Sequence, residues 1–157
     1  MKPLLVFHAE LTNDGDPTGR LEFWDVAEWP EVRTVERYTA LSGLPGWQDW
    51  QDQDTKARGP IPRMDRAGVS CYKVSTVPQF VSASEQPGIA GNFYEILPSY
   101  VENGRGLFGI HRDANVLGTA GCVGVRTDEG WKDFQARMCK LFEQHRITQV
   151  PLMIAYS

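Results

Sequence analysis

Cys122 and His111 are the two residues of this sequence whose types and spacing best suit covalent chemistry. His111 ends a short apolar run, and Cys122 opens the next one, eleven positions later, behind a glycine-bearing loop. Two adjacent strands would bring the pair together, and the imidazole would then take the thiol proton and stabilise the thiolate. The spacing therefore predicts a cysteine nucleophile with a histidine base.

The residues directly before the cysteine are small. Thr119, Ala120 and Gly121 leave room for backbone N–H groups to converge on the oxyanion of a tetrahedral intermediate. We expect Ala120, Gly121 and Cys122 to form that oxyanion hole. In other enzymes the loss of one such donor costs about 3 kcal/mol, so this loop matters as much as the thiol.

Both reactive residues also have an ordinary structural interpretation. Cysteine is among the most buried residue types, and a histidine at a strand end is often only hydrogen-bonded structure. The glycine-bearing turns that frame His111 and Cys122 favour the catalytic interpretation. Spacing alone leaves both interpretations open.

The elements that must position these residues are mainly strands. Short apolar and β-branched runs alternate with turn-rich segments such as NDGDPTG, SGLPG and EQPGIAGN. The pattern predicts a β-sandwich or barrel with strands at 4–11, 21–26, 32–41, 69–77, 93–97, 107–111, 122–126 and 150–156. The polar, proline-rich segment 47–66 is expected to be a long loop, and long loops often carry binding surfaces.

One segment near the C-terminus has helical periodicity. Its apolar residues recur at intervals of three or four: Trp131, Phe134, Met138 and Leu141. Thr127 and Asp128 precede them and can cap the first free N–H groups of a helix. We expect one amphipathic helix over about 129–145, packed on the sheet.

Composition and charge limit the function classes. The 157 residues, 41% hydrophobic and 23% charged, are typical of a single domain over 1–157 that buries ~70% of its unfolded surface. No stretch approaches the ~20 apolar residues of a membrane span. The net charge is −4 and Lys and Arg are scattered, so we expect no nucleic-acid partner.

The three cysteines indicate neither a disulfide framework nor a metal site. Cys71, Cys122 and Cys139 are odd in number, and the chain has no C-x-x-C or H-x-x-x-H motif. We expect no cofactor and at least one free thiol. The start, MKPLLVFHAELTNDGD, has one Lys and a short apolar run without a small-residue cleavage site, which indicates a first strand rather than a signal peptide.

The window IHRDANVLGTAGCVGV resembles the L,D-transpeptidase (YkuD-type) catalytic-domain family. That family's signature is a His on a strand, a loop, and then Ser or Thr, His, Gly and Cys on the next strand. His111, Thr119, Gly121 and Cys122 match it. SGLPG at 42–46, RGPIPRMD at 58–65 and VPLMIAY at 150–156 also resemble family segments, so the resemblance covers nearly the whole chain.

Three features depart from the family pattern. The motif His before Gly-Cys is Ala120 here, and the His to Cys interval is shorter than usual. The Arg that commonly follows the Cys by two residues is Gly124, with Arg126 two places later. The first departure bears on the oxyanion hole.

The resemblance implies acyl transfer on peptidoglycan stem peptides, at the bond between the L-centre of a diamino acid and a following D-residue. Cys122 would form a thioester and release it to water, a D-amino acid or a stem amine. The short loops beside the site favour hydrolysis or amino-acid exchange. Arg112 and Arg126 flank the site and suit the substrate's carboxylates, although solvated surface arginine is the competing interpretation.

In its compact loop and predicted lack of a signal peptide, the chain resembles the divergent family members found among phage lysis proteins and type VI secretion effectors. We therefore expect synthesis in the cytoplasm and action in the periplasm or on the cell wall after release, secretion or particle delivery. A papain-like endopeptidase fits less well, because its Cys opens a helix and its His lies downstream. The non-enzymatic alternative is a wall-binding or virion structural module on the same fold. It stays open because Ala120 stands where the family motif has a His. The sequence does not determine the oligomeric state.

Overall fold

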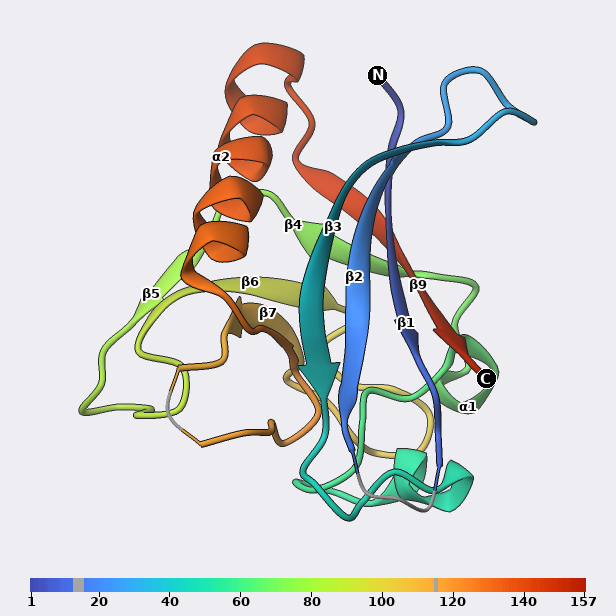
Figure 1. The fold of residues 1–157 in the computed structure, drawn as a ribbon, viewed down its shortest axis with the longest axis vertical. Coiled ribbons are helices and arrows are strands. Elements are labelled where there is room, and N and C mark those ends of the chain that lie inside the picture. The colour runs from blue at the N-terminus through green and yellow to red at the C-terminus, as the bar shows by residue number, and fades with distance from the viewer. Residues whose placement is uncertain (13–15, 115) are drawn as a thin grey trace.

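Strands dominate the computed structural model, which describes residues 1–12, 16–114 and 116–157. Over these residues the strands are β1 Pro3–Ala9, β2 Thr18–Asp25, β3 Arg33–Ser42, β4 Tyr72–Ser75, β5 Gln79–Val81, β6 Gly91–Leu97, β7 Gly109–Arg112, β8 Val123–Val125 and β9 Gln149–Tyr156. The helices are a 3-10 turn η1 Trp50–Asp54, a single turn α1 Met64–Ala67 and the long α2 Asp128–His145. The mainly β prediction is confirmed (Figure 1).

The sheet closes into a barrel of eight strands. Its order is β4-β9-β1-β2-β3-β8-β7-β6-β5, and β4 pairs with β6 as well as with β9, so the ring closes and β5 extends it outside β6. Figure 1 shows β9 beside β1, which joins the two ends of the chain in one sheet. The β1–β9 and β7–β8 pairs are parallel, and the other pairs are antiparallel.

Each of the eight predicted runs contains or overlaps one barrel strand. The run predicted at 69–77 is a strand only over Tyr72–Ser75, and the run at 122–126 only over Val123–Val125. Strand β5 was not predicted, because three residues directly after Pro78 are too few to show an alternation. Of the two predicted forms, sandwich and barrel, the chain adopts the barrel.

Alternate residues of the strands fill the barrel interior. Leu5 and Phe7 of β1 and Leu152 of β9 are fully buried, while most of their strand neighbours are only partly buried. Burial of each such side chain stabilises the fold by about 1.5–3 kcal/mol. The ring of Phe7 meets that of Tyr156 edge-on at 6.3 Å, so the parallel pair β1–β9 is also joined by aromatic packing.

Helix α2 covers the barrel over β3 and β6. Thr127 is its N-cap and accepts a hydrogen bond from the Gly130 N–H at 3.0 Å, as the sequence predicts. Phe134 is fully buried and meets the rings of Tyr38 and Tyr94 edge-on at 5.9 and 5.2 Å. The helix begins one residue earlier than predicted and ends as predicted, at His145. No helix in the described ranges is long and apolar enough to cross a membrane.

The segment predicted as a long loop, 47–66, contains η1 and most of α1 and packs against one end of the barrel. Side chains of the barrel hold its backbone. Ser42 Oγ accepts from the Ile61 N–H at 2.8 Å, and Tyr72 donates its hydroxyl to the Pro62 carbonyl at 2.6 Å. The hydroxyl of Tyr156 donates to the Ile61 carbonyl. Hydrogen bonds from barrel side chains therefore hold this segment against that end of the barrel.

Candidate active site

The strands that carry the two predicted reactive residues are direct neighbours. Strands β7 and β8 pair in parallel, with Ile110 opposite Val123 and His111 opposite Gly124. Ile110 and Val123 are fully buried in the core, so His111 points to the other face of the sheet. The sequence predicted that Cys122 opens the second strand, but Cys122 lies immediately before β8. His111 was predicted to end the first strand, but β7 continues one residue beyond it.

Cys122 lines a hollow of about 310 Å³, which we call the Cys122 hollow. The side chain is partly buried, and its Sγ lies 4.0 Å from the Leu107 carbonyl oxygen. Lys56, Ala120 and the buried Arg105 also line the hollow. The thiol is thus accessible from a recess that contains two cationic residues.

Burial raises the pKa of the Cys122 thiol to about 11. Two neighbours act in the opposite direction, since the Gly109 N–H is directed at the sulfur and the Arg105 guanidinium is close by. The resting side chain is therefore a protonated thiol near neutral pH. A thiolate requires a base or a change in its surroundings when substrate binds.

His111 is buried and held in one orientation. Its Nδ1 lies 2.9 Å from the Arg112 carbonyl oxygen, and its ring stacks on Phe93 with 6.3 Å between the centroids. Burial lowers the pKa of His111, although the Arg112 carbonyl and the charge of Asp113 raise it in part. With Nδ1–H donating to the carbonyl, the neutral ring presents Nε2 as a proton acceptor.

The imidazole and the thiol lie on or beside neighbouring strands but do not touch, and the described lining of the Cys122 hollow does not include His111. Within the described residues, no hydrogen bond joins the His111 ring to Cys122. Extending the register by one step puts Cys122 beside Gly109, two residues before His111 on the same strand. From ordinary sheet spacings the two Cα atoms are then roughly 8 Å apart. Side-chain rotation on substrate binding is needed to bring Sγ and Nε2 together, which apo active sites commonly require.

Residues 119–122 form a tightly held loop, called here the 119–122 loop. The buried Thr119 hydroxyl donates to the Cys122 carbonyl at 2.6 Å and accepts from the Gly43 and Gly121 N–H groups at 3.0 and 3.3 Å. Ser42 donates its hydroxyl to the Gly121 carbonyl at 3.2 Å. The loop is thereby fixed to the end of β3.

This arrangement modifies the predicted oxyanion hole. The Gly121 N–H is already engaged by Thr119, so an oxyanion would have to displace a long hydrogen bond to reach it. Gly121 has φ = +121°, a conformation that favours glycine, and a Cβ there would lie 2.6 Å from Arg105 Nη2. Ala120 is exposed at the hollow, and the side chain of Thr119 positions the loop.

Arg105 was not among the predicted site residues. Its guanidinium is buried and donates to the carbonyls of Gln53, Gly59, Pro60 and Ala120. The available signal was its place between two glycines, Gly104 and Gly106, just before the strand of His111. Lys56 was not predicted either, although it lies in the 47–66 segment that was expected to be a long loop of the kind that often carries a binding surface.

The two arginines predicted to bind substrate have other partners. Arg112 pairs with Asp128, with 3.0 Å between Nε and Oδ1, and Arg126 pairs with the buried Asp113, with 2.7 Å between Nη1 and Oδ2. Neither arginine lines the Cys122 hollow. The structure therefore assigns both to ion pairs beside β7 and β8, and the cations at the hollow are Lys56 and Arg105.

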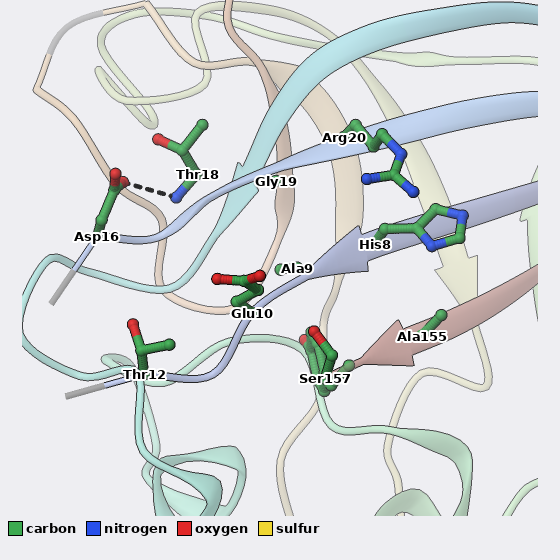
Figure 2. A pocket seen from close by; sticks show the side chains of 11 residues that line it. His8, Ala9, Glu10, Thr12, Asp16, Thr18, Gly19, Arg20, Ala155 and Ser157 are labelled. Carbon is green, nitrogen blue, oxygen red and sulfur yellow. Dashed lines mark hydrogen bonds between the residues drawn. The ribbon is translucent and has the colours of Figure 1, made fainter. Parts of the chain in front are cut away.

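A second and larger hollow, of about 490 Å³, lies at the ends of β1, β2 and β9 (Figure 2). His8 and Arg20 project from the neighbouring strands β1 and β2, and Glu10 lies near the end of β1. Burial and the charge of Arg20 lower the pKa of His8, whereas Glu22, 3.4 Å from its Nε2, raises it. The lining that the structure describes contains no cysteine, so covalent thiol chemistry belongs to the Cys122 hollow.

The described residues contain no group of three or more His, Cys, Asp or Glu placed to hold a metal ion. The sequence matches no protein-family model, and it is significantly similar to no curated protein.

Proposed function

We propose that this protein is a cysteine-dependent acyl-transfer enzyme of L,D-transpeptidase type that acts on peptidoglycan stem peptides. Cys122 is the nucleophile and His111 the base. The observation that carries the proposal is the position of Cys122, which lines a hollow directly before β8, while the neighbouring strand β7 bears a buried, oriented imidazole. The 119–122 loop supports the proposal because it holds the nucleophile's backbone from both sides.

The chemistry proceeds in two steps. The Cys122 sulfur attacks the carbonyl carbon of the L-centre while its proton passes to His111 Nε2, because a thiol of pKa about 11 is not ionised beforehand. The tetrahedral intermediate expels the amine of the D-residue, which takes the proton from the imidazolium and leaves a thioester. Water or a D-amino acid amine then attacks the thioester, returns a proton to the sulfur and frees the product.

The charge of the Cys122 hollow supports a substrate with a free carboxylate. Lys56 is exposed at the hollow, and no carboxylate of the described chain forms a salt bridge with it. The other cation, Arg105, already donates to four backbone carbonyls. Lys56 is therefore the residue we assign to the carboxylate of the stem peptide, either on the diamino acid or on the terminal D-alanine.

The test is mass spectrometry of disaccharide tetrapeptides incubated with the wild-type protein and with Cys122→Ala. We expect loss or exchange of the terminal D-alanine with the wild-type protein and none with the variant. Cys71→Ala and Cys139→Ala are matched controls, because neither thiol lines the Cys122 hollow, and both should retain turnover. Turnover that survives Cys122→Ala would refute the nucleophile.

A non-catalytic wall-binding or virion structural module on the same fold is the second candidate. Ala120 in the place of the family histidine and the separation of His111 from Cys122 favour it. Iodoacetamide labelling of the wild-type protein and of His111→Ala separates the two, since a catalytic Cys122 that passes its proton to His111 should react more slowly in the variant, whereas a structural thiol should react equally slowly in both. Labelling that does not depend on His111, together with retained binding to intact sacculi, would support the binding module.

We propose that the enzyme acts in the periplasm or on the cell wall, because its proposed substrate is peptidoglycan. Delivery by lysis, by a secretion machine or on a phage particle fits the resemblance to phage lysis proteins and type VI effectors.

A further inference from the structure

Arg105 is a buried cation whose hydrogen-bond partners are all neutral. Nη1 donates to the Gln53 and Pro60 carbonyls at 2.8 and 2.6 Å, and Nη2 donates to the Gly59 carbonyl at 2.9 Å. Only 3% of the residue is exposed. No carboxylate in the described ranges forms a salt bridge with it. A buried charge without a directly paired counter-ion is costly, which raises the question of a use for the charge itself.

The guanidinium lies directly against the 119–122 loop. Nη2 is 3.4 Å from the Ala120 carbonyl oxygen, and a Cβ on Gly121 would lie 2.6 Å from the same nitrogen. The guanidinium carbon is 5.4 Å from the centroid of the Phe108 ring, which also lines the Cys122 hollow. The charge is therefore adjacent to the backbone that carries the nucleophile.

We propose that Arg105 is the positioning residue of the nucleophile, fixing the Ala120–Gly121 backbone and supplying the buried positive charge that stabilises the Cys122 thiolate. The inference rests on the proposed function, because it assigns a thiolate to that site. It also explains why glycine stands at position 121, since a side chain there would push the guanidinium away.

The other groups around Arg105 and Cys122 do not replace this charge. Burial raises the pKa of Tyr72 and of Tyr156, so both hydroxyls stay neutral. Asp54 faces Arg105 from outside, where Arg66 and Asn103 donate to it. Towards solvent, Lys56 is exposed at the mouth of the Cys122 hollow, and on the neighbouring strand His111 is neutral. Burial raises the pKa of the thiol, and Arg105 and the Gly109 N–H oppose that effect.

The test compares Arg105→Met and Arg105→Lys with the wild-type protein. The iodoacetamide labelling rate of Cys122 is followed between about pH 7 and pH 12, a range that includes the thiol pKa of about 11, by peptide mass spectrometry, which separates it from Cys71 and Cys139. R105M should raise the pH midpoint of labelling by roughly 1 unit and slow labelling near neutral pH by up to tenfold. R105K keeps the charge and should stay closer to the wild-type midpoint.

The labelling midpoint distinguishes charge from packing. A purely structural arginine would, when removed, change the accessibility of the thiol and hence the labelling rate at every pH, without moving the midpoint. An unchanged midpoint in folded R105M overturns the inference. Wild-type turnover of tetrapeptides is measured in parallel and decides the proposed function separately, because the labelling midpoint does not depend on any substrate.

A second variant covers the case in which R105M does not fold. Asp54→Asn removes the exposed carboxylate that faces Arg105 and leaves all hydrogen bonds of the guanidinium in place. Because the negative charge of Asp54 then no longer cancels part of the positive charge of Arg105, the labelling midpoint of Cys122 should fall by roughly a few tenths of a pH unit. A midpoint equal to that of the wild-type protein overturns the inference.

Discussion

Replacing Thr119 by valine tests whether the 119–122 loop is held for catalysis. Valine has nearly the shape of threonine, so the change removes the hydroxyl with little effect on packing. That hydroxyl donates to the Cys122 carbonyl and accepts from the Gly43 and Gly121 N–H groups. The substitution therefore leaves one carbonyl and two N–H groups short of a partner in a region that is otherwise buried.

The expected loss of stability follows from these contacts. A buried donor without an acceptor costs about 1–3 kcal/mol. The 3.0 Å bond from Gly43 should dominate, because the bond from Gly121 is long at 3.3 Å. We expect the free energy of unfolding to fall by about 2–3 kcal/mol, which corresponds to a drop in Tm of roughly 4–12 °C for a chain of this length.

The assay combines thermal unfolding, followed by circular dichroism, with Cys122 labelling and tetrapeptide turnover at a temperature where all variants are folded. Thr127→Val is the matched control, since this N-cap hydroxyl also accepts an N–H, from Gly130 at 3.0 Å, but is exposed at the start of α2 and does not line the Cys122 hollow. It should lower stability by about 1 kcal/mol and leave Cys122 chemistry unchanged. Thr119→Ser should restore most of both properties.

Two results would refute the reasoning. A Thr119→Val protein as stable as the wild type would mean that the three hydrogen bonds contribute nothing net. A destabilised Thr119→Val protein whose labelling and turnover equal those of Thr127→Val would mean that the loop is structural and does not position the nucleophile.

The remaining predictions concern the base, the substrate cation and the glycine before the nucleophile. Because burial lowers the pKa of His111, the neutral base persists below its ordinary value of ~6.5, so wild-type turnover should decline only as the pH falls below about 6.5. His111→Ala should remove that acid limb and slow Cys122 labelling near neutral pH, and an unchanged profile would reassign the base. Lys56→Met should raise KM for carboxylate-bearing stem peptides by roughly tenfold and leave kcat unchanged, as measured by steady-state kinetics. With the amidated peptide as substrate, the wild-type protein and the variant should have the same KM, and a difference there would contradict the assignment. Gly121→Ala should cost about 1–3 kcal/mol in chemical denaturation, because it combines a positive φ with a close approach to Arg105, and wild-type stability would contradict the geometry.

Local sequence patterns predicted most of the barrel. The short apolar run that begins at Leu4 predicted the strand β1, and the helical spacing behind Thr127 located α2 to within one residue at its start. These features depend on neighbours in the chain, so periodicity and capping reveal them. Strand β5 was missed because a three-residue strand has no measurable period.

The candidate site was predictable in part. The glycine-framed positions of His111 and Cys122 indicated two adjacent strands, and β7 and β8 are paired. The substrate role of Arg112 and Arg126 was inferred from proximity in sequence, but the side chains turn to Asp128 and Asp113. An arginine's partner depends on which carboxylate the fold brings near, which no local pattern encodes.

The amino-acid sequence by itself determined a mainly β chain, one amphipathic helix, and a histidine on one strand with a cysteine directly before the next, because each rests on the period or the spacing of nearby residues. Only the tertiary structure decided that β4 closes the barrel onto β6, that Thr119 holds the nucleophile loop to β3, and that Arg105 lies beneath it. These contacts join residues that are far apart in the chain, such as Gln53 and Arg105. They form because the folded chain brings buried donors to carbonyls that would otherwise lack a partner.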